Sequence, residues 1–533
     1  MKLSATIANS LWATSSLPAW RRFRRALYDP AAAQQVWLRE HLRRNANCEF
    51  ARQHKLASMH GYEEFARRVP LMDYEQLEPW IKRIQQGEPR VLTTEPVTHL
   101  IPTSGSTKAH KLIPFTAGLQ RNFDCAIGPW ICDLARLHPG ILGGPAYWSI
   151  SPAIHPAVAE SSQVPVGFAD DANYLSGAKG WLVRAALVAP GGLAGNNDVE
   201  TFRLETLRCL LRERELRLIS VWHPSFLTLL LDALPLYWER LLAGLPNARQ
   251  LERADPQQPE TLWPNLRVIS CWGDAHAELA LNDLHRRFPN TTMQTKGLLA
   301  TEAFVTIPFA GQHPLAVRSH FFEFVDEAGR IRLAHELCAD ETYEVIVTTS
   351  GGLWRYRLGD LVRVTGFVGA TPSLRFLGRA GNVSNLCGEK LSETFVAGAI
   401  QLVAATLQQK PRFVLLAPEA VDHGWRYTLF LEGDGDLSAW AKPMEAQLRL
   451  NPNYEYCRQL GQLDALQACT IGSGAHEVFL RHEVTHGKRL GDVKTTFLSH
   501  RTDWAQQFLR NKLSGTPHSP SQPSSMFSTA TLR

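Results

Sequence analysis

The 533-residue sequence has no long apolar run, no CxxC pair and no strong excess of charge. No stretch approaches the length that a helix needs to cross a bilayer, and residues 1–20 lack the unbroken apolar core of a signal peptide. We therefore expect a cytoplasmic protein without a membrane partner. The formal net charge of +5 gives no argument for a nucleic-acid partner, and it is compatible with a small anionic substrate.

Cysteine is present but shows no pairing pattern. The nine cysteines are odd in number and scattered along the chain, which favours free thiols in a reducing cytosol over a disulfide framework or a zinc site. They are Cys48, Cys125, Cys132, Cys209, Cys271, Cys338, Cys387, Cys457 and Cys469.

The length suggests at least two domains, and the composition, with 44% hydrophobic and 20% charged residues, is that of a globular protein. We expect a large domain over 1–385, of which 1–100 is mainly helical. A Gly- and Asn-rich break near 378–389 precedes a smaller α+β domain over 386–513. The Ser/Pro/Thr-rich tail, 514–533, is typical of disorder.

The large domain alternates apolar runs with helical patterns. Residues 218–222 and 266–272 are predicted strands, and the apolar run 226–231 between them is a predicted buried helix. Strands that alternate with helices indicate βαβ units and a largely parallel sheet, which binds ligands at the carboxyl ends of its strands.

A later segment carries a candidate ribose contact. The β-branched run 343–349 predicts a buried strand that breaks at Ser350-Gly351-Gly352. Residues 353–357 then alternate apolar with basic side chains until Gly359-Asp360, and a second short strand, 361–365, follows. The Asp360 carboxylate could accept hydrogen bonds from a ribose diol. The alternative is a β-hairpin whose turn is stabilised by this aspartate.

Residues 101–115 contain a candidate phosphate loop. Hydroxyl side chains crowd around Gly105, and Lys108 and Lys111 follow, so that backbone amides, hydroxyls and ammonium groups could converge on a polyphosphate. The hydroxyl residues are Thr103, Ser104, Ser106 and Thr107. The segment lacks the GxxxxGK[ST] pattern of a Walker loop, and a plain polar turn before a strand is the alternative.

Three motifs in order resemble a known family. The loop at 103–111 resembles the phosphate loop of the adenylate-forming superfamily, which includes acyl-CoA synthetases and luciferase. With the LLATE segment at 298–302 and the YRLGD segment at 356–360, it is similar to the Gretchen Hagen family of auxin-responsive acyl-acid amido synthetases. The resemblance covers about residues 20–510. It implies an α/β fold: a large N-terminal adenylate-forming domain of mixed sheets and helices, and a smaller mobile α+β C-terminal domain.

The resemblance also implies roles for single residues around ATP. The loop residues Thr103, Ser104, Gly105, Ser106, Thr107 and Lys111 would cradle its phosphates. Lys108 departs from the family, because it stands where glycine is usual. Thr301 would contact the α-phosphate, and Glu302 would hold Mg²⁺, a hard cation that prefers oxygen ligands.

Further implied contacts lie on both sides of the predicted hinge. Trp272, Gly273 and Asp274 would lie against the adenine, Asp360 would bind the ribose, and Arg379 would assist there. Two lysines would be catalytic. Lys390 aligns with a DKxxE segment in which Glu389 replaces the usual aspartate, and Lys494 resembles a C-terminal lysine that domain rotation brings into the site.

The implied activity is a two-step ligation. Mg-ATP would activate a small carboxylic acid as an acyl-adenylate, and an amine, an amino acid by the resemblance, would then displace AMP. The alternatives are transfer to coenzyme A and a nucleotide-binding relative without catalysis. Which acid, which acceptor and which oligomeric state are left open. Several aromatic residues could line the acid pocket, although a place in the core is the favoured interpretation: Tyr147, Trp148, Phe168, Trp222 and His223.

A rival motif is the HExxH pattern at 482–486, which binds zinc in metalloproteases. That chemistry needs both histidines on one face of a helix and a third ligand. Val484 and Thr485 are poor helix formers, Gly487 follows at once, and no glutamate occurs after Glu483. We therefore predict a strand or loop there and no zinc site.

Overall fold

The computed structural model describes residues 3–59, 61–103, 111–148, 162–167, 186–188, 199–274, 277–380, 383–384, 386–421, 424–486 and 493–513. The predicted phosphate-loop residues Ser104, Gly105, Ser106, Thr107 and Lys108, with Phe168 and the tail 514–533, lie outside these ranges. Among the described helices, none combines the length and apolar character that crossing a bilayer requires. All nine cysteines are unpaired thiols, as their scatter predicts.

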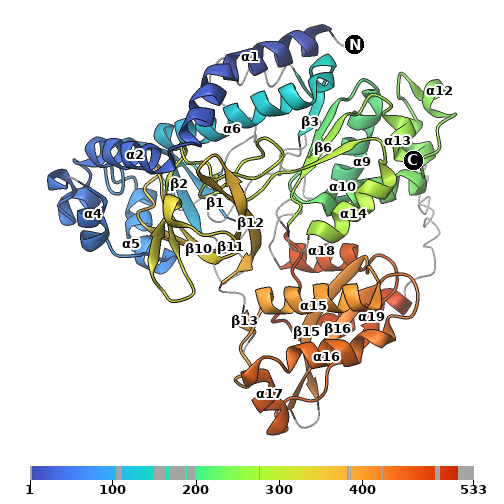
Figure 1. Cartoon of the computed structure of the whole chain (residues 1–533). Helices are drawn as coiled ribbons and strands as arrows, with labels where there is room; N and C mark the ends of the chain where they lie inside the picture. The colour runs from blue at the N-terminus through green and yellow to red at the C-terminus, as the bar shows by residue number, and fades with distance from the viewer. Residues whose placement is uncertain are drawn as a thin grey trace, which may run out of the picture.

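Helices open the chain and cover one side of the large domain (Figure 1). They are α1 (Leu3–Ala26), α2 (Pro30–Asn45), α3 (Glu49–Gln53), α4 (Tyr62–Arg68) and α5 (Tyr74–Gln85). At the start of α5, Asp73 and Gln76 form a reciprocal capping box. The long α6 (Ala117–Leu137) lies beside α1, where the Trp20 indole donates a 3.2 Å hydrogen bond to Asp133.

One of the two five-stranded sheets of the large domain is antiparallel, with strands in the order β12-β11-β10-β8-β9. Its strands are β8 (Phe321–Val325), β9 (Ile331–Leu333), β10 (Thr342–Thr348), β11 (Tyr356–Val368) and β12 (Thr371–Arg379). The prediction that Gly359-Asp360 separates two strands, and the hairpin alternative with it, is wrong, because β11 runs through both residues. Gly359 takes a φ of +72°. The register against β10 shifts between Arg357 and Leu361, and the register against β12 shifts after Leu361, so that the irregularity stays within the strand.

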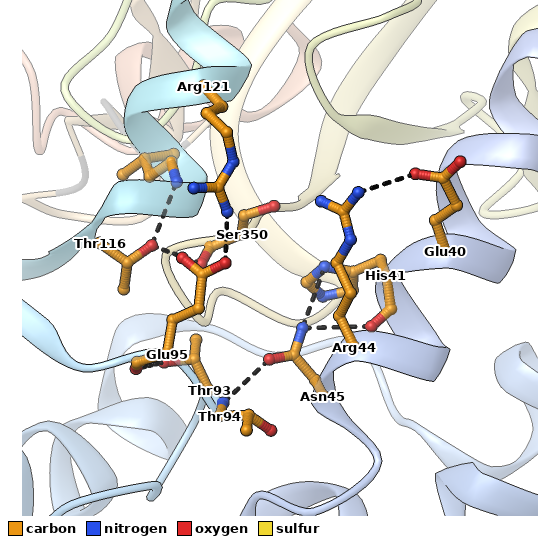
Figure 2. Close-up of polar contacts among 11 residues, drawn as sticks. Glu40, His41, Arg44, Asn45, Thr93, Thr94, Glu95, Thr116, Arg121 and Ser350 are labelled. Carbon is orange, nitrogen blue, oxygen red and sulfur yellow. Dashed lines mark hydrogen bonds and ion pairs between the residues drawn. The ribbon is translucent and has the colours of Figure 1, made fainter.

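The turn between β10 and β11 is tied to distant segments. The Thr116 hydroxyl, at the start of α6, donates a 2.8 Å hydrogen bond to the Ser350 carbonyl (Figure 2). A Cβ at Gly351 would lie 2.6 Å from the Pro114 carbonyl, so only glycine fits there. Beside this turn, Asn45 of α2 accepts a 3.0 Å bond from the Thr94 amide. These contacts join the start of α6 to the turn between β10 and β11, and the end of α2 to the segment around Thr94.

A parallel sheet in the order β4-β3-β5-β6-β7 forms the other half of the large domain. Its strands are β3 (Ala146–Trp148), β4 (Leu187–Val188), β5 (Leu218–Ser220), β6 (Val268–Cys271) and β7 (Thr292–Thr295). The helices α9 (Val199–Arg212), α10 (Pro224–Leu236) and α14 (Ala277–Arg287) accompany it, which confirms the predicted βαβ units. The predicted strands 218–222 and 266–272 are β5 and β6.

Short elements complete the large domain. A two-stranded antiparallel pair, β1 (Val97–Pro102) and β2 (Leu112–Thr116), flanks the predicted phosphate loop. The remaining helical segments are η1 (Leu56–Ser58), η2 (Pro139–Gly143), α11 (Trp238–Leu242), α12 (Ala248–Leu251), α13 (Pro259–Leu262) and η4 (Ala334–Glu336).

The C-terminal unit, orange to red in Figure 1, has its own hydrophobic core around Trp440 and Tyr454. It contains β13 (Val383–Ser384), β14 (Leu391–Ser392), α15 (Glu393–Leu407), β15 (Phe413–Val421), β16 (Gly424–Glu432), η5 (Ser438–Trp440), α16 (Ala441–Leu448), α17 (Pro452–Gln459), β17 (Gln467–Thr470), α18 (Ala475–Thr485) and α19 (Trp504–Leu513). Helices and a three-stranded sheet make this unit α+β.

The HExxH segment is helical, so the prediction of a strand or loop there is wrong. His482 and Glu483 belong to α18, because Phe479 in the same helix stacks on Trp504 and this packing outweighs the low helix propensity of Val484. His482 Nε2 lies 2.8 Å from Asp503, which engages that ring nitrogen. Among the described residues, the one group of three potential metal ligands within 4.8 Å of one another contains neither histidine of the motif.

A buried ion pair fixes the start of β11. Arg355, 2% exposed, lies 2.6 Å from Glu323, 1% exposed, and also donates to the Ala66 and Val69 carbonyls. The Tyr62 hydroxyl donates to the same glutamate at 2.8 Å. Removing one charge of such a pair leaves the other uncompensated in the interior.

We expect Arg355→Met to lower the free energy of unfolding by about 3–5 kcal/mol, because it leaves Glu323 buried without its counter-charge. The matched control is Arg357→Met, two residues along the chain, since the Arg357 side chain is 44% exposed where it pairs with Glu344. The control should lose less than about 1 kcal/mol. Urea unfolding measures both, and equal losses would contradict a dominant role for the buried pair.

Candidate active site

The predicted ribose residue pairs with the predicted assisting arginine. Asp360 on β11 lies opposite Arg379 on β12 in the antiparallel register. Arg379 Nε is 3.3 Å from Asp360 Oδ1, and the aspartate is almost fully buried. The charges of Asp360 and Glu302 raise the pKa of Arg379. Sheet pairing thus places the two predicted side chains together.

Glu302, the predicted metal ligand, joins the same cluster. It lies in a tight turn in which the Ala300 amide donates a 2.9 Å hydrogen bond to the Ala303 carbonyl. Burial raises the pKa of the Glu302 carboxyl; the charge of Arg379 opposes this rise, Asp360 adds to it, and Lys494 also opposes it. The cluster therefore joins two buried carboxylates to cations from both domains.

Lys494 reaches this region from the C-terminal unit. Its Nζ lies 4.5 Å from the centre of the Trp272 ring, which follows β6. A second contact between the domains is the ion pair of Arg203 on α9 with Glu477 on α18, at 3.4 Å. The structure therefore places the small domain so that Lys494 lies near the cluster, and the catalytic role of this lysine stays a prediction.

The predicted adenine segment is held between the two sheets. A Cβ at Gly273 would lie 2.0 Å from the Thr295 side chain, so glycine is required there. Asp274 accepts a 3.1 Å hydrogen bond from the Phe376 amide of β12 and lies 3.7 Å from Arg375. Burial raises the pKa of Asp274. Asp274 thus connects the end of β6 to the sheet that carries Asp360.

The stem of the predicted phosphate loop is described at both ends. The Thr103 amide donates a 2.8 Å hydrogen bond to the Lys111 carbonyl, which closes the stem. Lys111 Nζ lies 5.4 Å from the Tyr74 ring. The Thr103 hydroxyl is buried without a hydrogen-bond partner in the described structure. An orphaned buried hydroxyl at the neck of such a loop fits a bound phosphate.

The electrostatic neighbourhood of Tyr356 links this stem to the cluster. Burial raises the pKa of the Tyr356 hydroxyl, and the negative charge of Glu302 adds to the rise, as do Tyr74 and Asp360. Tyr74 also accepts a 2.8 Å hydrogen bond from the Leu112 amide of β2. The stem, Tyr74 and the carboxylate cluster are therefore neighbours.

Lys390, predicted as catalytic, lies elsewhere in this arrangement. It is exposed with a φ of +46°, and its carbonyl accepts a 3.3 Å hydrogen bond from Asn451. The preceding Glu389 is buried and accepts hydrogen bonds from the Leu386 amide and the Tyr427 hydroxyl. No contact given by the described residues joins Lys390 to Glu302, and the catalytic role of this lysine stays a prediction.

Two of the aromatic residues considered as lining for the acid pocket differ in position: one lies in the core and one at the carboxyl edge of the parallel sheet. Tyr147, in β3 of the parallel sheet, is buried in the hydrophobic core, as the favoured interpretation predicts. Trp222, by contrast, is half-buried, and its ring centre lies 5.8 Å from that of Trp272. Trp222 therefore extends the cluster along the carboxyl edge of the parallel sheet.

One residue at this edge escapes the sequence analysis. Lys296 follows β7 and is 3% exposed, and burial lowers the pKa of its amine to about 7. The only signal in the sequence is its place shortly before the LLATE motif. A lysine is so often exposed that its burial could be recognised only from the fold.

Three family models match this chain. Models described as the GH3 family N-terminal, central and C-terminal domains match residues 19–258, 313–379 and 396–503 in order. A probable indole-3-acetic acid-amido synthetase, GH3.12 of Oryza sativa subsp. japonica, is 24% identical over 89% of this chain and 92% of its own length.

Other relatives carry similar names. The jasmonoyl-L-amino acid synthetase GH3.5 of the same plant is 22% identical over 88% of this chain and 92% of its own. The solved structure of the AtGH3.15 acyl acid amido synthetase in complex with 2,4-DB has a TM-score of 0.79 at 17% identity, covering 94% of this chain and 96% of that one. It shows the same fold. The matched domains span most of the sequence in the family's order, and the chain belongs to the GH3 family.

Proposed function

We propose that this protein is an ATP-dependent acyl-acid amido synthetase. A carboxylate oxygen of the acid attacks the α-phosphorus of ATP and expels pyrophosphate, and the nitrogen of an amino acid then attacks the acyl carbon, loses a proton and expels AMP. The observation that supports it best is the convergence of Glu302, Asp360 and Arg379 with Lys494 of the other domain. We also propose a cytoplasmic location.

The described residues fit the nucleotide and its cation. Asp360 offers acceptor oxygens to the ribose hydroxyls, with Arg379 holding the carboxylate in place. Glu302 offers the oxygen that Mg²⁺ prefers, and the cation, when bound, would neutralise phosphate charge. Thr301 is the candidate contact of the α-phosphate.

The remaining assignments complete the nucleotide site. Trp272, Gly273 and Asp274 would lie against the adenine, and the loop would hold the outer phosphates through Thr103, Ser104, Gly105, Ser106, Thr107 and Lys111. Consecutive amides and hydroxyls of this kind suit a polyphosphate.

The position of Lys494 suits the first half-reaction. An anionic acid approaching a polyphosphate is repelled, so that a cation placed where charge develops lowers the barrier. A later rotation of the small domain would remove Lys494 and admit the amine, and in that second arrangement Lys390 would have its role.

The acceptor separates this proposal from its nearest alternative. Transfer to coenzyme A would yield a thioester from the same adenylate. The names of two relatives, a probable indole-3-acetic acid-amido synthetase and a jasmonoyl-L-amino acid synthetase, favour the amide. A nucleotide-binding relative without catalysis would have no need of the Lys494 contact.

The proposed function predicts acid-dependent exchange of labelled pyrophosphate into ATP. A panel of aryl, indolyl and aliphatic acids with Mg²⁺ should contain at least one that supports exchange, and excess EDTA should abolish it because the outer phosphates then lack their counter-ion. Mass spectrometry of reactions supplied with amino acids or coenzyme A then identifies amide or thioester. If no acid in the panel supports exchange, the proposal fails.

The position of Lys494 predicts a selective loss. Lys494→Ala should slow adenylate formation about 100-fold, equivalent to about 3 kcal/mol, because the cation acts only in the first transition state. Reaction of an amine with preformed acyl-adenylate should remain close to the unmodified rate. Pyrophosphate exchange and single-turnover aminolysis measure the two halves.

The control for that variant is Lys442→Ala, which removes a lysine from the small domain in α16. It should leave both half-reactions unchanged. Equal damage by Lys494→Ala to both halves would instead indicate general destabilisation of the small domain.

A further inference from the structure

Lys296 lies at the carboxyl edge of the parallel sheet, just after β7 and against the ends of β5 and β6. Its amide donates a 2.9 Å hydrogen bond to the Cys271 carbonyl at the end of β6. Its Nζ donates a 2.6 Å hydrogen bond to the Ser220 hydroxyl at the end of β5. This edge is where parallel sheets bind their ligands.

Two indole rings enclose the ammonium group. Nζ lies 5.1 Å from the Trp130 ring centre and 5.6 Å from that of Trp222. Trp130 is fixed because its indole donates a 2.9 Å hydrogen bond to Gln294, which also accepts from Ser270 at 3.0 Å. The faces of these indole rings attract a cation, so the two tryptophans stabilise the charged form of the amine.

The amine nevertheless lacks a counter-charge within the described residues. Within the described residues no ion pair includes Lys296, and the Ser220 hydroxyl accepts a hydrogen bond from one of the three N–H groups of its ammonium. The neighbouring Cys271 cannot neutralise it, because burial raises the pKa of that thiol to about 12. Burial without a counter-charge lowers the pKa of this amine to about 7, and a carboxylate bound beside it would supply that counter-charge and favour the ammonium form.

Contacts lead from this amine to the cluster. Trp222 shields Lys296 on one side and contacts Trp272 on the other, with ring centres 5.8 Å apart. The Lys494 ammonium lies over the Trp272 ring. Its positive charge acts on Glu302, where it opposes the rise in pKa that burial causes. Lys296 thus stands at the far end of an aromatic row that begins at the proposed adenylation site.

We propose that Lys296 is a specificity-determining residue that binds a second carboxylate, at the end of the acyl acid remote from the reacting one. This inference rests on the proposed function and names its substrate class: dicarboxylic acids, with a hydroxyl as a weaker substitute. A carboxylate supplies the missing counter-charge and accepts hydrogen bonds from the two remaining N–H groups of the ammonium, and charge-assisted hydrogen bonds of this kind are the strongest available to a buried lysine.

The test compares matched acids in pyrophosphate exchange. The two series are heptanedioate, 6-hydroxyhexanoate and hexanoate, and 4-carboxyphenylacetate, 4-hydroxyphenylacetate and phenylacetate. In at least one series the unmodified protein should prefer the dicarboxylate about 10- to 100-fold in kcat/KM. Lys296→Met should abolish or invert this preference through KM, with kcat for the monocarboxylate retained, because ground state and transition state share the contact.

Two controls separate a specific loss from misfolding. Lys82→Met removes a lysine that is 64% exposed in α5 and should leave the preference unchanged. Ser220→Ala retains the ammonium and should keep most of the preference. A structural role for Lys296 would lower exchange with all acids alike.

A binding measurement without ATP keeps this inference distinct from the proposed function. The favoured dicarboxylate should raise the unfolding temperature of the unmodified protein but not that of Lys296→Met. If monocarboxylates are exchanged as well as dicarboxylates and neither shifts the unfolding temperature, the assignment of Lys296 is overturned while the ligase proposal stands. If no acid supports exchange, the ligase proposal fails, and the thermal shift alone decides whether Lys296 binds a carboxylate.

Discussion

The proximity of two buried carboxylates, Glu302 and Asp360, is the constraint on which the rest of the site depends. Carboxylates that share a low-dielectric region repel one another and need cations. Arg379 supplies one across the paired strands, and Lys494 supplies another from a different domain. Because the two carboxylates need nearby cations, they favour both a bound Mg²⁺ ion and the position of the small domain that places Lys494 beside them. We therefore expect nucleotide binding and domain position to be coupled.

Both sheets of the large domain contribute side chains to this region. The antiparallel sheet presents Asp360 and Arg379, and its strand β11 is held at its start by the buried pair of Arg355 and Glu323. The parallel sheet presents Trp272 and Lys296 at its carboxyl edge. The reacting carboxylate of the acid would thus lie at the charged cluster. The other end of the acid would contact the Lys296 amine, which lies between two indole rings.

The resemblance to the family implied the residues of the cluster but not their surroundings. Glu302, Asp360 and Lys494 carry recognisable neighbours in the chain, and the structure brings all three together. The continuous strand through Gly359 was missed, because sheet pairing on both sides overrides a local break signal. The helical HExxH segment depends on packing against Trp504, and the burial of Lys296 depends on Trp130 from a distant helix. Such contacts have no local signature.

The central claim is that the observed docking of the two domains is the adenylation arrangement. Arg203→Cys and Glu477→Cys, introduced together at the interdomain ion pair, would allow a short bismaleimide to lock it; the exposed Cys338 would be replaced by serine. The decisive measurement is the ratio of pyrophosphate exchange to amide formation before and after cross-linking. We expect the locked protein to retain exchange and to lose amide formation. Loss of exchange with amide formation from preformed adenylate intact would contradict the claim.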